Sequence, residues 1–220
     1  MFCRIEQYII FHIVSRYTGS SITYIHREIF KMSNNNILVC IGNSIVNGFP
    51  HRRSQSFSSI LRDTTDYNVI NKGVNGDTTA GMKYRFEHDV LSKHPGCVML
   101  LTGSNDFIMG SSTVEKCMKD IKELSEAVTV QGGRMILLTP ILCDPEKASA
   151  SWIPADYETA CVKLKQLAAL MKDYAEESGC QVIDLQEGFK ACSDFVDGVH
   201  PTVAGQKFIA DFIRSQLPPL

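Results

Sequence analysis

The 220-residue chain lacks several features that would point to particular classes of function. Its formal net charge is -2 and its pI is about 6.3, so it has no basic excess of the kind that binds nucleic acid. It contains no H-E-x-x-H zinc motif and no G-x-S-x-G elbow. The stretch from Gly42 to Gly48 resembles a phosphate-binding loop, but Phe49 stands where that loop needs a lysine. We therefore expect no nucleic-acid partner.

Near its N-terminus the chain has no apolar run long enough to span a membrane. The segment Tyr8–Val14 is far shorter than the roughly 20 apolar residues that a bilayer requires. It is also a poor signal-peptide core, because His12 interrupts it, Glu6 precedes it and no small-residue cleavage site follows. We expect residues 1–32 to be a dispensable N-terminal extension and residues 33–220 to form one domain.

The cysteines form no C-x-x-C pair, although the chain contains eight of them. Several fall within apolar runs, where a free thiol behaves as a small hydrophobic side chain. The sequence has no N-x-[ST] glycosylation site either. Together these features favour a reducing compartment, and we expect a cytoplasmic location.

Short apolar segments alternate along the chain with longer segments of helical period. Such alternation predicts an α/β fold, a parallel sheet with helices on both faces. The predicted strands are Ile37–Ile41, Tyr67–Asn71, Cys97–Thr102, Arg134–Thr139 and Gln181–Leu185. The predicted helices lie near Ser56–Arg62, Thr79–Ser92, Val114–Val130, Ala155–Ser178 and Ala204–Gln216.

Residues with catalytic potential follow these predicted strands. Ser44 comes directly after the first strand, and a serine becomes a useful nucleophile when a base takes its proton and a third group orients that base. Asp197 and His200 lie three positions apart near the C-terminus, where one turn can supply both partners. Alone, each residue is more often an ordinary turn or capping residue, so the combination carries the prediction.

A serine hydrolase also needs donors aimed at the negative charge that develops on the substrate oxygen. The backbone N–H groups of Ser44 and Gly76 and the side-chain amide of Asn105 are the candidates for this oxyanion hole. Gly76 lacks a side chain and so permits close approach of a substrate. Taken singly, Gly76 could be a simple turn glycine and Asn105 a turn residue.

Four segments of the chain resemble, in the same order, the four sequence blocks of the SGNH (GDSL-type) hydrolases. They are Gly42-Asn43-Ser44, Gly76, Gly103-Ser104-Asn105-Asp106 and Asp197-Gly198-Val199-His200-Pro201. The resemblance implies that Ser44 is the nucleophile, that His200 is the base and that Asp197 orients it. It implies that Ser44, Gly76 and Asn105 form the oxyanion hole. It further implies a three-layer α/β/α sandwich with a five-stranded parallel sheet, flavodoxin-like, and no metal or organic cofactor. One departure is Asn43, where the family usually has Asp.

The function expected from this resemblance is a serine esterase that cleaves small carboxylic esters or thioesters through an acyl-enzyme intermediate. A carbohydrate deacetylase or lysophospholipase using the same site is an alternative, and so is a non-catalytic binding module. The segment Leu142–Tyr157, which carries Trp152, either overhangs the site and shapes an acyl pocket or packs down as a surface loop. The sequence leaves the exact substrate and the oligomeric state open.

Overall fold

The computed structural model describes residues 36–190, 194–218 and 220, so the predicted extension 1–32 lies outside the described residues and its dispensability stays a prediction. The described chain forms a five-stranded sheet in the order β2-β1-β3-β4-β5, and every neighbouring pair of strands is parallel. The strands are β1 (Ile37–Gly42), β2 (Asn68–Gly73), β3 (Cys97–Leu101), β4 (Arg134–Leu138) and β5 (Gln181–Ile183).

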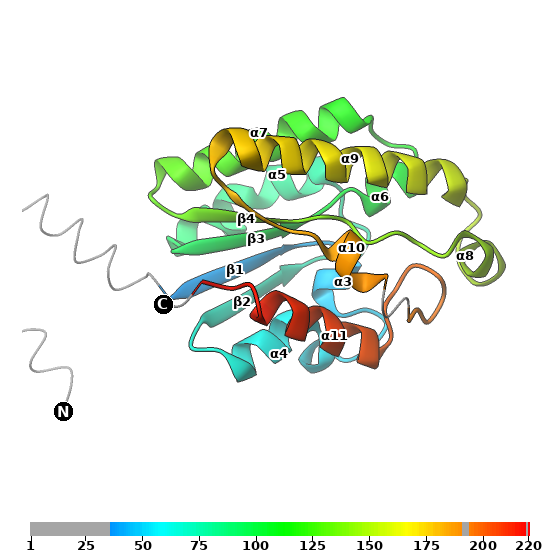
Figure 1. The fold of residues 1–220 in the computed structure, drawn as a ribbon, viewed down its shortest axis with the longest axis horizontal. Coiled ribbons are helices and arrows are strands. Elements are labelled where there is room, and N and C mark those ends of the chain that lie inside the picture. The colour runs from blue at the N-terminus through cyan, green and yellow to red at the C-terminus, as the bar shows by residue number, and fades with distance from the viewer. Residues whose placement is uncertain (1–35, 191–193, 219) are drawn as a thin grey trace, which may run out of the picture. The chain divides into compact units, whose positions relative to one another are not determined.

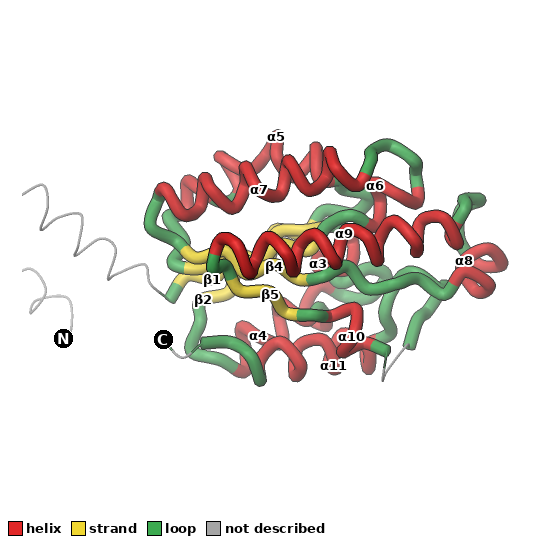
Figure 2. The backbone as a smooth tube through the Cα atoms, turned by 45° about the horizontal axis from the view of Figure 1, so that its top comes forward, coloured by secondary structure: helices red, strands yellow, loops and turns green. Residues whose placement is uncertain are grey.

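Helices cover both faces of this sheet, as Figure 1 shows from the side and Figure 2 after a turn of 45°. One layer consists of α5 (Thr79–Asp89), α7 (Val114–Val130) and α9 (Tyr157–Ser178), and the other of α4 (Phe57–Thr64) and α11 (Val203–Arg214). The predicted three-layer α/β/α sandwich is confirmed. The strand order is that of flavodoxin-like sheets.

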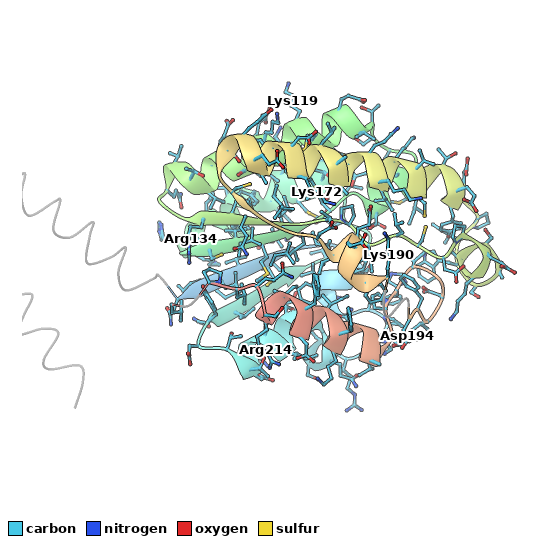
Figure 3. All side chains as sticks on the ribbon, in the orientation of Figure 1. Lys119, Arg134, Lys172, Lys190, Asp194 and Arg214 are labelled. Atoms are coloured by element: carbon cyan, nitrogen blue, oxygen red, sulfur yellow. The ribbon has the colours of Figure 1, made fainter. Side chains whose placement is uncertain are left out.

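The two hydrophobic cores lie between the sheet and its two helical layers. Side chains along a strand point alternately to opposite faces, so each buried strand supplies both cores. In β1, Val39 and Ile41 pack against the layer of α5, α7 and α9, whereas Leu38 and Cys40 pack against α4 and α11. Charged side chains occupy the outer surfaces instead, as with Lys119 on α7 and Arg214 on α11, which are labelled in Figure 3.

All of the predicted strands and helices are present, but their ends differ in places. β2 continues to Gly73 because its pairing with β1 runs in register from Asn68 opposite Ile37 to Gly73 opposite Gly42. The fifth strand ends earlier than predicted, since Leu185 already begins a helix. Four short α-helices were not predicted because they are too brief to show a helical period. They are α3 (Ser44–Asn47), α6 (Ser104–Ile108), α8 (Pro145–Ser151) and α10 (Leu185–Phe189).

Two 3₁₀-helices, η1 (Arg53–Gln55) and η2 (Leu91–Lys93), complete the described helices. Within the described ranges, no helix combines the length and the apolar character needed to cross a lipid bilayer. The short helices α3, α6 and α10 each follow the carboxyl end of a strand. Because all strands are parallel, these ends meet at one edge of the sheet, which is where open α/β sheets form their sites.

Gly73 lets the backbone of α3 pack directly against the end of β2. A Cβ atom at this position would lie 2.7 Å from the Cα of Asn47 and 2.7 Å from the carbonyl carbon of Val46. Both of these neighbours are backbone atoms, so they cannot rotate away as the tip of a side chain could. The position therefore requires glycine.

We predict that Gly73→Ala destabilises the protein by roughly 1–3 kcal/mol, as overpacking does elsewhere, and also lowers activity by displacing α3. Urea unfolding measures the loss of stability, and the initial rate of the expected ester hydrolysis measures the loss of activity. Gly110→Ala is the control, because a Cβ there would meet no atom within 4 Å and only its positive φ of 62° opposes the change. Equal stability and equal activity in Gly73→Ala and wild type would contradict the prediction.

Candidate active site

Ser44 lies at the junction between β1 and α3. Asn43 is the N-cap of α3, with its Oδ1 accepting a hydrogen bond of 3.0 Å from the backbone N–H of Ile45. Ser44 is then the first residue of the helix, so its own backbone N–H has no partner within that helix. The buried strand and this cap present both the hydroxyl and the N–H of Ser44 at the edge of the sheet.

Asp197 and His200 belong to one closed turn that leads into α11. An antiparallel bridge between Phe195 and Pro201 closes the turn, and the N–H of Val196 donates to the carbonyl of His200 at 2.8 Å. The Oδ1 of Asp197 accepts the backbone N–H groups of Val199 at 3.0 Å and His200 at 2.8 Å. These bonds fix one carboxylate oxygen to the backbone and leave the other, Oδ2, for the imidazole.

The three side chains form a continuous chain of hydrogen bonds. The Oδ2 of Asp197 lies 2.7 Å from the Nδ1 of His200, and the Nε2 of His200 lies 2.9 Å from the Oγ of Ser44. A carboxylate can only accept, so Nδ1 carries the proton and Nε2 is free to accept the proton of the serine hydroxyl. All three residues are buried, with exposed fractions of 6% for Ser44, 8% for Asp197 and 3% for His200.

The environment of Asp197 keeps its carboxyl group ionised. Burial alone raises the pKa of Asp197. The backbone N–H and the imidazole of His200, together with the N–H of Val199, outweigh burial and hold the pKa below its ordinary value of 3.8. A charged acceptor is therefore available to orient His200 at neutral pH.

Gly76 lies in the loop between β2 and α5, at the same edge of the sheet. Its φ of +76° favours glycine, and a Cβ there would meet no atom within 4 Å. The space beside Gly76 is therefore open to a ligand. The side chains of Asn47 and Asn75 join this loop to α3 through a hydrogen bond of 2.8 Å.

Asn105 lies in α6, directly after β3. Its side-chain Nδ2 donates to the backbone carbonyl of Asp77 at 2.8 Å, which connects α6 to the loop that contains Gly76. A primary amide has two N–H bonds, so the second remains for a substrate oxygen. Thus the predicted oxyanion donors lie on segments that follow three neighbouring strands, and the loop of Gly76 is hydrogen-bonded to both α3 and α6.

Two aromatic side chains pack around His200, and sequence reasoning did not assign either to it. The ring of Phe49 lies 4.8 Å from the imidazole centroid and the ring of Trp152 lies 4.9 Å from it, both in T-shaped contacts. Trp152 comes from the segment 142–157, and its ring contacts the imidazole of His200 while 38% of the residue stays exposed; that this segment shapes an acyl pocket stays a prediction.

The short helix α8 contacts the turn that carries Asp197 and His200. The backbone N–H of Asp144, its N-cap, donates to the carbonyl of Gly198 at 2.7 Å, and the Nζ of Lys147 donates to the carbonyl of Phe195 at 2.5 Å. A Cβ at Gly198 would lie 2.8 Å from the Cα of Ala148. Sequence spacing gave no signal for these contacts because they join segments about 50 residues apart.

A separate groove of about 770 Å³ lies at the opposite edge of the sheet. Arg134 and Gln181, the first residues of β4 and β5, line it together with the ends of α7 and α9. It therefore shares no residue with the Ser44–His200–Asp197 arrangement. Within the described part of the chain, no group of three or more His, Cys, Asp or Glu side chains is arranged to hold a metal ion.

Comparison with known proteins gives a consistent result. Residues 40–208 match the model of the GDSL-like lipase/acylhydrolase family. The chain is 24% identical over 189 residues to Esterase TesA of Pseudomonas aeruginosa, which covers 83% of this chain and 88% of that protein. It is 25% identical over 165 residues to an acetylxylan esterase of Geobacillus stearothermophilus, which covers 64% of this chain and 68% of that protein.

The fold of this chain also matches the folds of several solved structures. The lipase/acylhydrolase from Enterococcus faecalis superposes with a TM-score of 0.71 at 22% identity, covering 84% of this chain and 98% of that one. The acetyl xylan esterase AlAXEase superposes with a TM-score of 0.69 at 21% identity, covering 83% of this chain and 100% of that one. At this level of identity the structural likeness establishes the fold.

The hydrogen bonds to Asp197 predict how stability depends on pH. Because the folded-state pKa of Asp197 is lowered from 3.8, its carboxylate contributes stability above that value and loses it as the pH falls through the folded-state pKa. We predict that the excess stability of wild type over Asp197→Asn is larger at about pH 6 than at about pH 3. Urea unfolding of both proteins across that range measures it. A difference that does not change with pH would contradict the prediction.

Proposed function

The chain belongs to the GDSL-like lipase/acylhydrolase family and is a hydrolase of the SGNH type, and we propose that it is a serine esterase acting on small carboxylic esters or thioesters. The observation that carries this proposal is the unbroken hydrogen-bond chain from Ser44 through His200 to Asp197. This arrangement supplies a nucleophile, a base and an orienting carboxylate. The esterase relatives are in accord with this chemistry.

The first half of the proposed reaction is acyl transfer to Ser44. His200 Nε2 takes the hydroxyl proton as Ser44 Oγ attacks the ester carbonyl, and the imidazolium that forms is stabilised by Asp197. The negative charge on the tetrahedral intermediate is bound by the N–H groups of Ser44 and Gly76 and the amide of Asn105. His200 then gives its proton to the departing alcohol or thiol, leaving the acyl group on Ser44.

The second half returns the enzyme to its starting state. Water enters in place of the alcohol, and His200 removes its proton as the water oxygen attacks the acyl carbonyl. The same donors stabilise the second tetrahedral intermediate. His200 then protonates the oxygen of Ser44, and the carboxylic acid leaves. Every proton in this cycle passes through one imidazole nitrogen, Nε2.

The second candidate function is removal of acetyl groups from carbohydrates. It is favoured by the relatedness to an acetylxylan esterase, and an acetyl ester requires no change in the proposed mechanism. Release of acetate from acetylated xylo-oligosaccharides, compared with hydrolysis of a simple acetate ester, separates the two. A much higher kcat/KM for the carbohydrate would favour the deacetylase.

We also propose that the protein works in a reducing compartment such as the cytoplasm. Each of the described cysteines is a free thiol, including Cys143 and Cys161, whose sulfur atoms lie 2.9 Å apart. Free cysteine thiols are typical of proteins kept in a reducing compartment. Thiol titration of protein purified without reductant tests this proposal.

The central prediction is that Ser44→Ala abolishes ester hydrolysis without unfolding the protein. The substitution removes the nucleophilic oxygen, and alanine is tolerated at the first turn of a helix. His200→Ala should be almost as damaging, and the double variant should be little worse than either, because the residues act as a unit. A fluorophosphonate probe should phosphonylate wild-type Ser44 and leave Ser44→Ala unmodified. Hydrolysis at wild-type rate by folded Ser44→Ala would refute the assignment, and an unlabelled wild type would favour a binding module.

The supporting residues should show graded losses of hydrolysis in the same assay. Asn105→Ala is expected to lose roughly 100- to 1,000-fold in kcat, the usual effect of removing one oxyanion donor. Asp197→Asn should fall between Asn105→Ala and Ser44→Ala, because the imidazole remains present but loses its orientation. Melting temperatures serve as the folding control for every variant.

The aromatic pair beside His200 predicts a preference for short acyl chains. Phe49 and Trp152 lie 5.9 Å apart and both contact the imidazole, so they narrow the space next to Ser44. We expect kcat/KM to be higher for para-nitrophenyl acetate and butyrate than for the octanoate. Trp152→Ala should raise the relative kcat/KM for octanoate, whereas Val130→Ala, an exposed change on α7, should not. Values of kcat/KM that climb steadily with chain length in wild type would contradict the prediction.

A further inference from the structure

Arg85 is a largely buried cation on α5 that takes no direct part in the proposed reaction. Its guanidinium donates from Nε to Oδ2 of Asp77 at 2.8 Å, and Nη2 lies 2.7 Å from the same oxygen. Nη2 also donates to the backbone carbonyl of Gly42 at 3.2 Å. Nη1 donates to Oδ2 of Asp89 at 2.8 Å. One side chain therefore joins β1, the loop after β2 and the end of α5.

The residues bonded to Arg85 are direct neighbours of the catalytic groups. Gly42 lies two positions before Ser44, and Asp77 immediately follows Gly76. The carbonyl of Gly42 also accepts the N–H of Val74 at 3.0 Å. It therefore has two donors, one from the loop after β2 and one from Arg85 on α5. These bonds set the spacing between the nucleophile turn and the loop of Gly76.

Asp77 extends this connection to the third oxyanion donor. Its carboxylate binds Arg85, while its backbone carbonyl accepts the side-chain amide of Asn105 at 2.8 Å. The segments that carry Ser44, Gly76 and Asn105 therefore all meet at the ion pair of Arg85 with Asp77. A shift of this pair would move the predicted donors relative to one another.

The ion pair of Arg85 with Asp77 is largely buried, so a change in its geometry is poorly compensated by solvent. The side chains of Arg85 and Asp77 are only 16% and 9% exposed, so solvent does little to replace a missing partner. Burial raises the pKa of Asp77, and the hydrogen bonds and charge of Arg85 oppose that rise. Asp89 is additionally paired with Lys72 at 2.9 Å, so it keeps a cationic partner if Arg85 is changed.

We propose that Arg85 is a positioning residue that sets the geometry of the oxyanion hole by binding Gly42 and Asp77 together. The proposal rests on the esterase function proposed above. It requires the planar fork of a guanidinium, which can reach the Gly42 carbonyl, Asp77 and Asp89 at once, whereas the ammonium of a lysine is a single point of charge.

The test compares Arg85→Gln and Arg85→Lys with wild type in hydrolysis of para-nitrophenyl acetate. We expect Arg85→Gln to lower kcat by roughly 10- to 100-fold with KM within about threefold, because misplaced donors stabilise the transition state less. Arg85→Lys keeps the positive charge beside both carboxylates, so it should fold even if Arg85→Gln does not. It should still lose roughly 10-fold in kcat, since the fork is gone.

Lys83→Gln is the matched control. Lys83 lies on the same helix, but its ion pairs are with Asp120 at 2.6 Å and Glu123 at 2.5 Å on α7 and not with the segments of Ser44, Gly76 and Asn105. This variant should lose stability through a broken ion pair while keeping wild-type kcat.

A second test combines Arg85→Lys with Asn105→Ala in one protein. If Arg85 acts through the oxyanion hole, Arg85→Lys should cost clearly less in the Asn105→Ala background than in wild type.

Wild-type kcat in folded Arg85→Gln or Arg85→Lys would overturn the proposal, and so would fully additive losses in the combined variant. Ester hydrolysis by the wild-type protein tests the proposed function, whereas the comparison of the variants with wild type tests the role of Arg85. If wild type did not hydrolyse esters, the proposed function would fail, and the rate of phosphonylation of Ser44 by a fluorophosphonate would then report on Arg85. Equal phosphonylation rates in wild type and Arg85→Lys would overturn the positioning role as well.

Discussion

The site depends on the parallel pairing of β1 with a strand on each side. The register places Gly42 opposite both Gly73 of β2 and Leu101 of β3, so three strands end at the same level. The chain leaving each strand then reaches the same edge, and Ser44, Gly76 and Asn105 arrive there from segments that are far apart in sequence. Close packing at this edge requires glycine, since a Cβ at Gly42 would lie 2.7 Å from the carbonyl oxygen of Leu101.

Asn43 shows how this chain departs from the usual SGNH block without losing its local structure. Asn43 is 1% exposed, and its side-chain oxygen caps α3 through the N–H of Ile45. An aspartate would provide the same acceptor but would also bury a charge, which carries a desolvation cost. The neutral amide keeps the cap and adds no negative charge near the proposed oxyanion hole. The turn that presents Ser44 thus depends on the acceptor oxygen of residue 43 and not on its charge.

The sequence predicted the parallel sheet because buried strands are short apolar runs and the helices between them have a clear period. In α9, for example, the apolar residues that recur at helical spacing are buried: Cys161, Leu164, Leu167, Ala168 and Met171. Ser44, Gly76 and Asn105 could be selected because each follows a predicted strand, and Asp197 with His200 because one turn holds both. Arg85 could not be selected, since its contact with Gly42 spans 43 residues and leaves no local pattern. The same holds for the contact of Trp152 with His200, because a single aromatic residue in a loop does not reveal which surface it covers.

The two halves of the site are supported by different parts of the fold and are brought into register by a buried amide. Arg85, Asp77 and Asn105 join the segments of the proposed oxyanion donors across β1, β2 and β3, while the turn of the proposed base His200 contacts α8 through Asp144 and Gly198. Gln206, on the helix that follows His200, is fully buried and donates to the carbonyl of Ile45 at 3.1 Å.

The same side chain of Gln206 accepts the backbone N–H of Phe57 at 2.8 Å, so α11 is bonded to both α3 and α4. A buried amide satisfied at both ends specifies its position strongly, because any shift would leave a polar group without a partner. The separation of 2.9 Å between Ser44 and His200 is therefore held by more than their own hydrogen bond. If a substrate breaks that bond, as the proposed mechanism requires, the two hydrogen bonds of Gln206 still join α11 to α3 and α4.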